Sequence, residues 1–371
     1  MSIFHVALKR VVDDSYEIEI GYGLQDKLVA DLQKGLVGKV KKFALITDST
    51  VKGLYADAIE EKIKEAGFFC RTFVIPAGEK SKTREMKALL EDQMLAAGFR
   101  RDCCVLAVGG GVVTDLAGFL AGTYARGVPF INYATTMLAA ADASVGGKTA
   151  VDTPLATNLI GLFNQPKKVY LDIACWSTLS PRELSCGLAE TIKHACLADL
   201  GMFEYLENHM QELLAVEKTA CSYIAEKNCD IKYHVVMQDE KESGLREILN
   251  LGHTAGRAIE TLSDYRLMHG EAVAIGMAAE VDLAADLGFM TVEEAERVKG
   301  LYRAAGLSVS IPEYIDREEL VKKLYTDKKV KEGRLRFVLQ EGIGAIREYE
   351  PGVYAHPVTE EKAREIILAM K

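Results

Sequence analysis

Three residues that lie far apart in the sequence carry side chains able to bind a divalent metal ion. Glu190 stands in the segment GLAETIKHA, His253 in NLGHT and His269 in MHGEA. Two imidazoles and one carboxylate form a ligand set that leaves room for water or substrate on a catalytic Zn²⁺. Each histidine also precedes an expected helix beside a glycine, where a capping or hydrogen-bonding role is common. Because only folding can bring the three residues together, the spacing leaves both interpretations open.

A run of glycines marks a candidate site for a phosphate group. Gly109, Gly110 and Gly111 follow the apolar segment VLAV and precede an expected helix. Glycines allow the backbone to approach a pyrophosphate closely, and a helix N-terminus offers unpaired N–H groups and a positive dipole end. The run does not match the G-x-G-x-x-G fingerprint, so an ordinary strand-to-helix turn is the alternative. In the loop PAGEKSK, Glu79 either accepts a hydrogen bond from a ribose hydroxyl or belongs to a charged turn.

A lysine that follows two glycines suits the binding of a phosphate or a carboxylate. In DASVGGKTAVD, Lys148 and Thr149 look like the end of a P-loop, but Asp142 occupies the place of its first glycine, which excludes a Walker A site. Other cations would meet an anionic substrate if folding gathers them, and otherwise each belongs to a solvated face. These other cations are Arg126, Lys193, Lys232, Arg246, Lys328 and Lys329.

The elements that must position these residues follow two patterns. In the first half, apolar strand-like runs (43–47, 73–75, 103–108, 130–133 and 169–171) alternate with helical segments (60–66, 84–97 and 112–121). This alternation predicts an α/β fold, with a Rossmann-like parallel sheet covered by helices. After about residue 180 the pattern predicts helices over 181–198, 202–215, 218–237, 254–262, 270–287, 291–305 and 359–370. We therefore expect an N-terminal α/β domain over 1–178 and a mainly α-helical domain over 179–371.

Composition narrows the class of protein. The 371 residues include 45 Lys and Arg against 54 Asp and Glu, a net charge of −9, which argues against a non-specific nucleic-acid binder. The sequence contains neither an apolar run long enough for a transmembrane helix nor a signal peptide, so no membrane association is expected. Eight irregularly spaced cysteines without a CxxC motif suit free thiols in a reducing compartment. We expect a cytoplasmic enzyme, and a homodimer is the usual assembly for that class.

Taken together, the motifs resemble the 3-dehydroquinate synthase family of sugar-phosphate cyclases. The resemblance runs from about Asp48 to Gly344, and its combination of motifs is specific although no single motif is. It implies a lyase that uses NAD catalytically, with a divalent metal ion, to convert 3-deoxy-D-arabino-heptulosonate 7-phosphate into 3-dehydroquinate and phosphate in aromatic amino-acid biosynthesis. The motifs are GGGVVTDLAGF (109–119), YARGV (124–128), DASVGGKTAVD (142–152), PRELSCGLAETIKHA (181–195), GLREILNLGHT (244–254), MHGEAVAIGM (268–277) and DKKVKEG (327–333).

The resemblance also implies a role for individual residues. Glu190, His253 and His269 would bind Zn²⁺ or Co²⁺. The NAD site would comprise Asp48, Glu79, Lys82, Gly110, Gly111, Val112, Val113, Thr114, Asp115, Thr135, Thr136, Lys148, Thr178 and Leu179. The phosphorylated sugar acid would be surrounded by Arg126, Asp142, Lys148, Asn158, Lys193, Lys232, Arg246, Asn250, Arg257 and one of Lys328 and Lys329.

Two positions depart from the family pattern. Thr157 stands where a lysine is usual, and Arg257 stands where a second histidine is usual, four residues after His253. Neutral variation is one explanation. A second is compensation, in which one positive charge moves from 157 to 257 and Arg257 grips the phosphate. A third is another phosphorylated sugar as substrate. A metal-dependent polyol dehydrogenase of similar build is a further alternative, although it does not need so many cations. Thr114, where glycine is common, bears only on the local loop shape.

Overall fold

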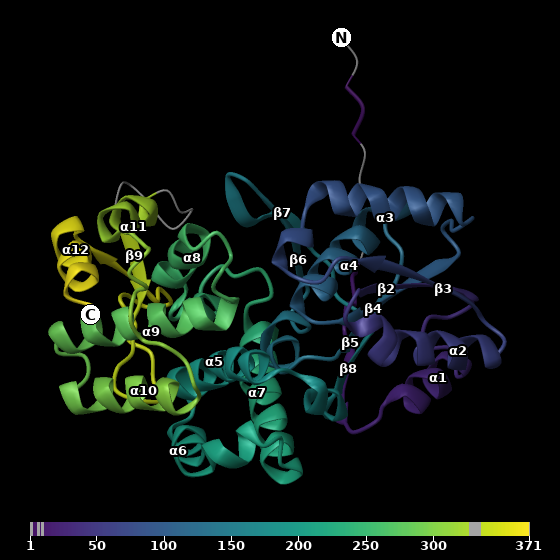
Figure 1. Ribbon diagram of the computed structural model, residues 1–371. Coiled ribbons are helices and arrows are strands. Elements are labelled where there is room, and N and C mark those ends of the chain that lie inside the picture. Colours follow the sequence, from purple (N-terminus) through teal and green to yellow (C-terminus); the bar gives the residue numbers. More distant parts are fainter. Residues whose placement is uncertain (1–2, 6–7, 9–10, 326–334, 371) are drawn as a thin grey trace.

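The N-terminal part of the protein is built on a parallel sheet. The computed structural model describes residues 3–5, 8, 11–325 and 335–370. Within these residues, six strands form one sheet in the order β1-β8-β5-β4-β2-β3 (Figure 1). They are β1 (Glu17–Gly21), β2 (Lys42–Asp48), β3 (Phe69–Ile75), β4 (Cys103–Gly109), β5 (Phe130–Ala134) and β8 (Lys168–Asp172).

Helices cover both faces of this sheet, because successive side chains of a strand point to opposite faces. On β2, Phe43 and Leu45 join the apolar cluster beneath α1 (Gln25–Gln33) and α2 (Asp57–Glu65). The alternate residues Ala44 and Ile46 join the cluster beneath α3 (Arg84–Ala96) and α4 (Gly111–Thr123). Figure 1 shows these two helix pairs on opposite sides of the strands. The predicted parallel sheet covered by helices is confirmed.

The strand order reverses between β2 and β4. From β2 the chain moves outward to β3, whereas β4 pairs with the other side of β2 and leads on to β5. Ligands of open α/β sheets bind in the crevice outside the carboxyl ends of the strands at such a switch point. β2 ends at Asp48 and β4 at Gly109, so this crevice lies beside the glycine run.

An antiparallel hairpin, which the sequence patterns did not predict, precedes β8. Its strands are β6 (Lys148–Thr153) and β7 (Ala156–Phe163), and the register shifts between Val151 and Thr153. β7 lacks the regular alternation of buried and exposed residues that identifies a strand in sequence. The hairpin reaches from the sheet toward the helical part (Figure 1) and so brings its residues to the junction between the two.

The second part of the chain is mainly helical, as predicted, and most helix ends lie within three residues of the expected positions. Pro181 and a capping box between Ser180 and Glu183 fix the start of its first helix. Helix α11 and the short antiparallel pair β9 and β10 were not predicted. The elements are α5 (Pro181–Ala198), α6 (Leu200–Leu214), α7 (Lys218–Gln238), α8 (His253–Leu262), α9 (His269–Asp286), α10 (Val292–Ala304), α11 (Arg317–Leu324), α12 (Glu360–Ala369), β9 (Leu335–Val338) and β10 (Ala355–Val358).

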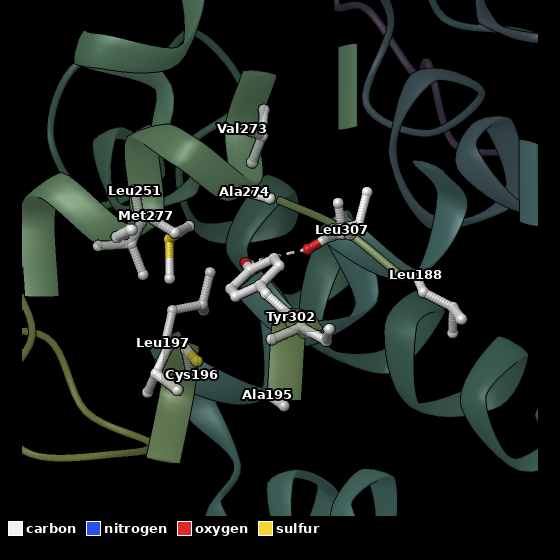
Figure 2. Packing of buried hydrophobic residues seen from close by; sticks show 14 of the residues in the cluster. Leu188, Ala195, Cys196, Leu197, Leu251, Val273, Ala274, Met277, Tyr302 and Leu307 are labelled. Atoms are coloured by element: carbon white, nitrogen blue, oxygen red, sulfur yellow. Dashed lines mark hydrogen bonds between the residues drawn. The ribbon is translucent and has the colours of Figure 1, made fainter. Parts of the chain in front are cut away.

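Helices α5 and α9 pack closely around an apolar core. Figure 2 shows the Tyr302 side chain of α10 among Leu188, Ala195, Leu197 and Met277, and its hydroxyl donates to the Ala189 carbonyl oxygen at 3.2 Å. A Cβ atom at residue 270 would lie 2.1 Å from the Cys186 carbonyl oxygen of α5, so only glycine permits this approach. The close packing fixes α9 and its first residue, His269, against the helix that carries Glu190.

All eight cysteines are buried and unpaired, in agreement with the expected free thiols. Among the described residues, none of the helices combines the length and apolarity that a membrane span requires.

Candidate active site

A cavity of about 350 Å³ lies between the sheet part and the helical part. The sheet part contributes the hairpin β6–β7, the start of α4 and Asp142, whereas the helical part contributes α7, α8 and the start of α9. The cavity gathers many of the residues that the sequence singled out. These are Asp115, Asp142, Lys148, Thr157, Asn158, Lys232, Arg246, Asn250, His253, Arg257 and His269.

The three predicted metal ligands converge at one end of this cavity. One ligand atom from each of Glu190, His253 and His269 lies within 4.8 Å of the others. The Nε2 atoms of His253 and His269 are 3.6 Å and 3.5 Å from Glu190 Oε1. Both Glu190 oxygens are buried and make no hydrogen bond, although the Lys193 ammonium lies against one of them. This arrangement fits a metal ion, since buried carboxylate oxygens require a partner.

In both His253 and His269, the second ring nitrogen, Nδ1, contacts an oxygen other than those of Glu190. His253 Nδ1 lies 3.0 Å from the Leu251 carbonyl oxygen, and His269 Nδ1 lies 3.3 Å from Glu260 Oε2. Such outer partners fix the tautomer and leave Nε2 as the ligand atom. Burial lowers the pKa of His253, which keeps its imidazole neutral. Burial favours the neutral form of Glu190, but Lys193 and His253 outweigh it and hold the pKa of that carboxyl well below its usual range.

A second donor group shares Glu190 but is already engaged by other side chains. It consists of Asp142, Glu190 and His194. Asp142 Oδ1 lies 2.6 Å from the Lys232 ammonium, and His194 Nδ1 lies 3.0 Å from Asn228 Oδ1. From the sequence we expected His194 not to be a ligand, and these contacts favour that expectation.

Three predicted substrate cations are almost wholly buried around the cavity. Lys193 Nζ donates to the Leu249 carbonyl oxygen at 3.0 Å. Lys232 pairs with Asp142, and although burial favours the neutral acid, Lys232 and Lys193 hold the pKa of that carboxyl well below its usual range. Arg246 donates to the Glu240 and Gly146 carbonyl oxygens at 2.6 and 2.9 Å, while its buried Nε has no partner. The charge of each is therefore held in a fixed position, which suits an anionic ligand.

Glu242 is a member of the site that sequence reasoning missed. Its Oε2 lies 2.6 Å from Lys148 Nζ, and its Oε1 accepts from Asn250 Nδ2 at 2.7 Å. Burial lowers the pKa of Lys148 to about 8 even though Glu242 acts in the opposite direction. Glu242 lies two residues before the GLREILNLGHT motif, which was the only available signal.

Lys82 connects the sheet part to the hairpin. Its buried ammonium lies 2.6 Å from Asp115 Oδ2 and donates to Asn158 Oδ1 at 2.7 Å. Burial disfavours this charge, but Asp115 and Glu79 outweigh it and raise the pKa of Lys82. Glu79 lies 3.6 Å from the same ammonium, and burial raises the pKa of its carboxyl to about 7. Lys82 and Glu79, both predicted to hold the cofactor, are thus connected to residues of the substrate cavity.

The glycine run forms the N-terminus of α4 at the sheet crevice. Gly110 is the N-cap, and no side chain caps the helix there. A Cβ atom at Gly110 would lie 3.1 Å from the Thr136 side chain, so glycine leaves the space between the helix N-terminus and Thr136 open. The first turn contains Gly111, Val112, Val113 and Thr114. This uncapped N-terminus beside the strand switch point fits the pyrophosphate of a dinucleotide.

The other predicted cofactor residues lie around the same crevice. Thr135 and Thr136 follow β5, and the Thr135 hydroxyl is buried without a partner. Asp48 accepts hydrogen bonds from the Thr50 and Val51 amides at 2.8 and 2.9 Å, so it also caps the turn that follows β2. Thr178 is hydrogen-bonded to Tyr55, and Leu179 follows it before α5.

Some predicted residues lie elsewhere. Arg126 is exposed, has a φ of +72° and is not part of the cavity lining. Lys328 and Lys329 lie outside the described residues. Glu260, which holds His269, was not predicted, although its position seven residues after His253 places both on one face of α8.

The sequence matches both parts of one protein family. Residues 72–186 match the family described as "3-dehydroquinate synthase N-terminal", and residues 187–330 match "3-dehydroquinate synthase C-terminal". A curated relative from Caldanaerobacter subterraneus subsp. tengcongensis, named 3-dehydroquinate synthase, is 46% identical over 333 residues. That match covers 90% of this chain and 93% of the relative.

Solved structures share the fold. The chain superimposes with a TM-score of 0.86 on a 2-epi-5-epi-valiolone synthase from Streptomyces hygroscopicus with NAD⁺ and Zn²⁺ bound. The two are 27% identical, and the match covers 98% of each chain. A 2-deoxy-scyllo-inosose synthase complexed with carbaglucose-6-phosphate, NAD⁺ and Co²⁺ gives the same TM-score at 24% identity, covering 95% of this chain and 96% of that one.

Proposed function

The chain belongs to the 3-dehydroquinate synthase family, and we propose that it converts 3-deoxy-D-arabino-heptulosonate 7-phosphate into 3-dehydroquinate and phosphate. The observation that carries this proposal is the junction of three features at one cavity. A His₂Glu donor set lies at one end, fixed cations line the walls, and an uncapped helix N-terminus opens beside it. A lyase that eliminates phosphate and uses NAD catalytically needs all three.

Glu190, His253 and His269 hold the divalent metal, Zn²⁺ or Co²⁺. When bound, such an ion polarises a substrate oxygen as a Lewis acid. Glu260 and the Leu251 carbonyl orient the two imidazoles for that task. The neutral His253 and the ionised Glu190 are already in the protonation states that metal binding requires.

The switch-point crevice would hold NAD⁺, which when bound would supply reversible hydride transfer at a substrate carbon. The first turn of α4 holds the pyrophosphate, and Thr135 and Thr136 lie beside it. Asp48, Glu79 and Lys82 hold the adenosine side, whereas Asp115, Lys148, Thr178 and Leu179 complete the site. Because the cofactor is regenerated in each turnover, no NADH accumulates.

The residues of the chain orient the substrate and stabilise its charges. Lys148, Asn158 and Arg246 hold the phosphate, while Lys193, Lys232 and Asn250 hold the carboxylate and hydroxyls. Asp142 keeps Lys232 in position through its 2.6 Å ion pair. Burial of Lys193, Lys232 and Arg246 strengthens these interactions, because charges are screened less away from water. Arg126 and the lysine pair at 328 and 329 are assigned to the substrate by the family motif alone.

The ligand we assign is a small phosphorylated sugar acid rather than a nucleic acid, because a cavity of about 350 Å³ suits a small molecule. We place the division between the two parts at residues 178 and 179, immediately before the Ser180 cap of α5. Eight unpaired thiols support a cytoplasmic location, since reducing compartments keep cysteines free.

We propose a homodimer. Phe4 and Val11 expose 88% and 100% of their surface, and Ile3 and Leu8 expose about as much. Exposed apolar side chains are often covered in an assembly. Sedimentation should give twice the 40.7 kDa of one chain, and a mass of one chain would contradict the proposal.

The decisive test is phosphate release from 3-deoxy-D-arabino-heptulosonate 7-phosphate by the enzyme loaded with NAD⁺ and Zn²⁺. Phosphate should appear while NADH absorbance shows no lasting rise. His269→Ala, which removes a proposed metal ligand, should release none. Absence of turnover by an unsubstituted enzyme shown to hold cofactor and metal would overturn the proposal, and steady accumulation of NADH would indicate a dehydrogenase instead.

A further inference from the structure

Arg257 places a guanidinium at the wall of the cavity. It lies on α8 one turn after His253, is half-buried, and lines the same cavity as the metal ligands. Its backbone carbonyl accepts from the Thr261 hydroxyl at 2.9 Å. Within the part of the chain that the structure describes, its side chain makes no hydrogen bond or ion pair.

The other cations of the cavity are all engaged. Lys148 pairs with Glu242 and Lys232 with Asp142, each at 2.6 Å, while Arg246 donates to two backbone carbonyl oxygens. The acidic neighbour of Arg257 on the same helix face, Glu260, lies against His269 instead. A partly buried cation without a protein partner is costly, and an anionic ligand would offset that cost.

On the opposite wall, Thr157 of β7 lines the cavity from the side of the sheet part. The cation of that wall, Lys148 on β6, is already paired with Glu242. Arg257 lies instead on the helix that also carries His253. Because His253 and Arg257 are four residues apart on one helix, their side chains are neighbours on one face. Helix α8 therefore fixes the distance between the metal site and a ligand group held by Arg257.

We propose that Arg257 binds the phosphate group of the substrate, through a bidentate contact, and thereby determines specificity for the phosphorylated sugar acid. The planar fork of a guanidinium matches two phosphate oxygens. Arg257 lies close enough to Lys148 to repel its positive charge and lower its pKa. A phosphate dianion bound between the two cations would offset this repulsion. The inference rests on the proposed function for the identity of the substrate.

An arginine at this position binds charge but exchanges no proton near neutral pH. A histidine in its place would carry a positive charge only when protonated, below about pH 6.5. This difference separates direct contact with the anion from a purely structural role of residue 257.

The test compares Arg257→Ala, Arg257→Lys and Arg257→His in the enzyme loaded with NAD⁺ and Zn²⁺. For Arg257→Ala we expect KM to rise roughly 10- to 100-fold and the affinity for inorganic phosphate to fall by a similar factor, the usual range for losing a charged hydrogen bond. Arg257→Lys should be intermediate. Arg257→His should show a KM that rises as the pH passes about 6.5. Adding Thr157→Lys to Arg257→Ala should restore part of the phosphate affinity.

Arg303→Ala, which removes an exposed charge from α10, is the matched control and should change neither constant by more than twofold. Thermal unfolding checks that each variant is folded. If Arg257→Ala is folded and leaves both KM and phosphate affinity unchanged, the inference is wrong. If the unsubstituted enzyme releases no phosphate from the sugar acid, the proposed function fails instead, and the inorganic-phosphate comparison still decides whether Arg257 binds that anion.

Discussion

The Lys148 ammonium lies 2.6 Å from the Glu242 carboxylate and connects hairpin β6–β7 to the segment that leads into α8. Burial lowers the pKa of Lys148 to about 8, Glu242 opposes the shift, and Arg246 and Arg257 add to it. One of the cations that we assign to the substrate phosphate thus titrates just above neutral pH, and Glu242 limits how far burial lowers its pKa.

This pair predicts a pH dependence. Above about pH 8 Lys148 loses its proton and its attraction for an anion, so kcat/KM should fall. Glu242→Gln removes the charge that raises the pKa, so the fall should begin at a lower pH. Lys148→Arg keeps its charge and should lack this fall. Profiles of phosphate release against pH measure all three, and an unmoved alkaline limb in Glu242→Gln would contradict the assignment.

The periodicity of the sequence predicted most of the fold, because strands buried on both faces and amphipathic helices have strong local patterns. Cys103–Gly109 is wholly buried, and α5 begins at a proline behind a serine cap. Hairpin β6–β7 was not predicted because its strands form a sheet of their own and β7 is partly exposed. Its existence depends on contacts across the chain rather than on local propensity.

The site was predicted as a set of residue types, but its pairings were not. Glu190, His253 and His269 were metal-ligand candidates by residue type and were assigned to the metal by the family resemblance, and the structure brings them together. The role of Glu242 depends on where the hairpin carries Lys148, which no spacing reveals. The role of Glu260 could have been predicted from the sequence, since this residue follows His253 by two helical turns.

Glu260 should position His269 for metal binding. Its Oε2 lies 3.3 Å from His269 Nδ1, and an outer carboxylate of this kind typically contributes about 10- to 100-fold to metal affinity. Glu260→Gln should therefore weaken Zn²⁺ binding by about that factor, as measured by competition with a chelator. Glu207→Gln is the matched control, because that carboxylate pairs with Arg297 and does not line the cavity. Equal affinities in the two variants would remove Glu260 from this role.

Asp31 should stabilise the sheet part through buried ion pairs. Its carboxylate lies 2.7 Å from the Lys27 ammonium and 2.9 Å from that of Lys168, and it accepts from the Tyr170 hydroxyl. Burial opposes ionisation, but these partners lower the pKa of Asp31 from 3.8 to about 2. A depressed carboxyl pKa stabilises the fold above the unfolded value, and the stabilisation fades as pH falls toward the folded value.

Asp31→Asn should accordingly lower the free energy of unfolding by about 2 kcal/mol at neutral pH. The difference from the unsubstituted protein should shrink to about half near pH 3, midway through the titration. Urea unfolding at pH 7 and pH 3 measures both values. A deficit that is the same at the two pH values would mean that lost packing, rather than lost charge, causes the effect.

Gly270→Ala should separate the two helices that carry Glu190 and His269. The added Cβ would lie 2.1 Å from the Cys186 carbonyl oxygen, and backbone of α5 cannot yield as a flexible side chain would. Overpacking of this kind costs typically about 1–3 kcal/mol. The shift should also weaken Zn²⁺ binding, because the ligand atoms now lie within 4.8 Å of one another and any movement of α9 changes that spacing.

Gly300→Ala provides the contrast. Gly300 lies in α10, and a Cβ atom there would meet nothing within 4 Å. Alanine in a helix interior is favoured over glycine by about 0.5–1 kcal/mol, so this variant should be more stable and bind Zn²⁺ normally. Thermal unfolding with and without Zn²⁺ distinguishes the two. If Gly270→Ala behaves like Gly300→Ala, the close approach of α9 to α5 does not hold the metal ligands in place.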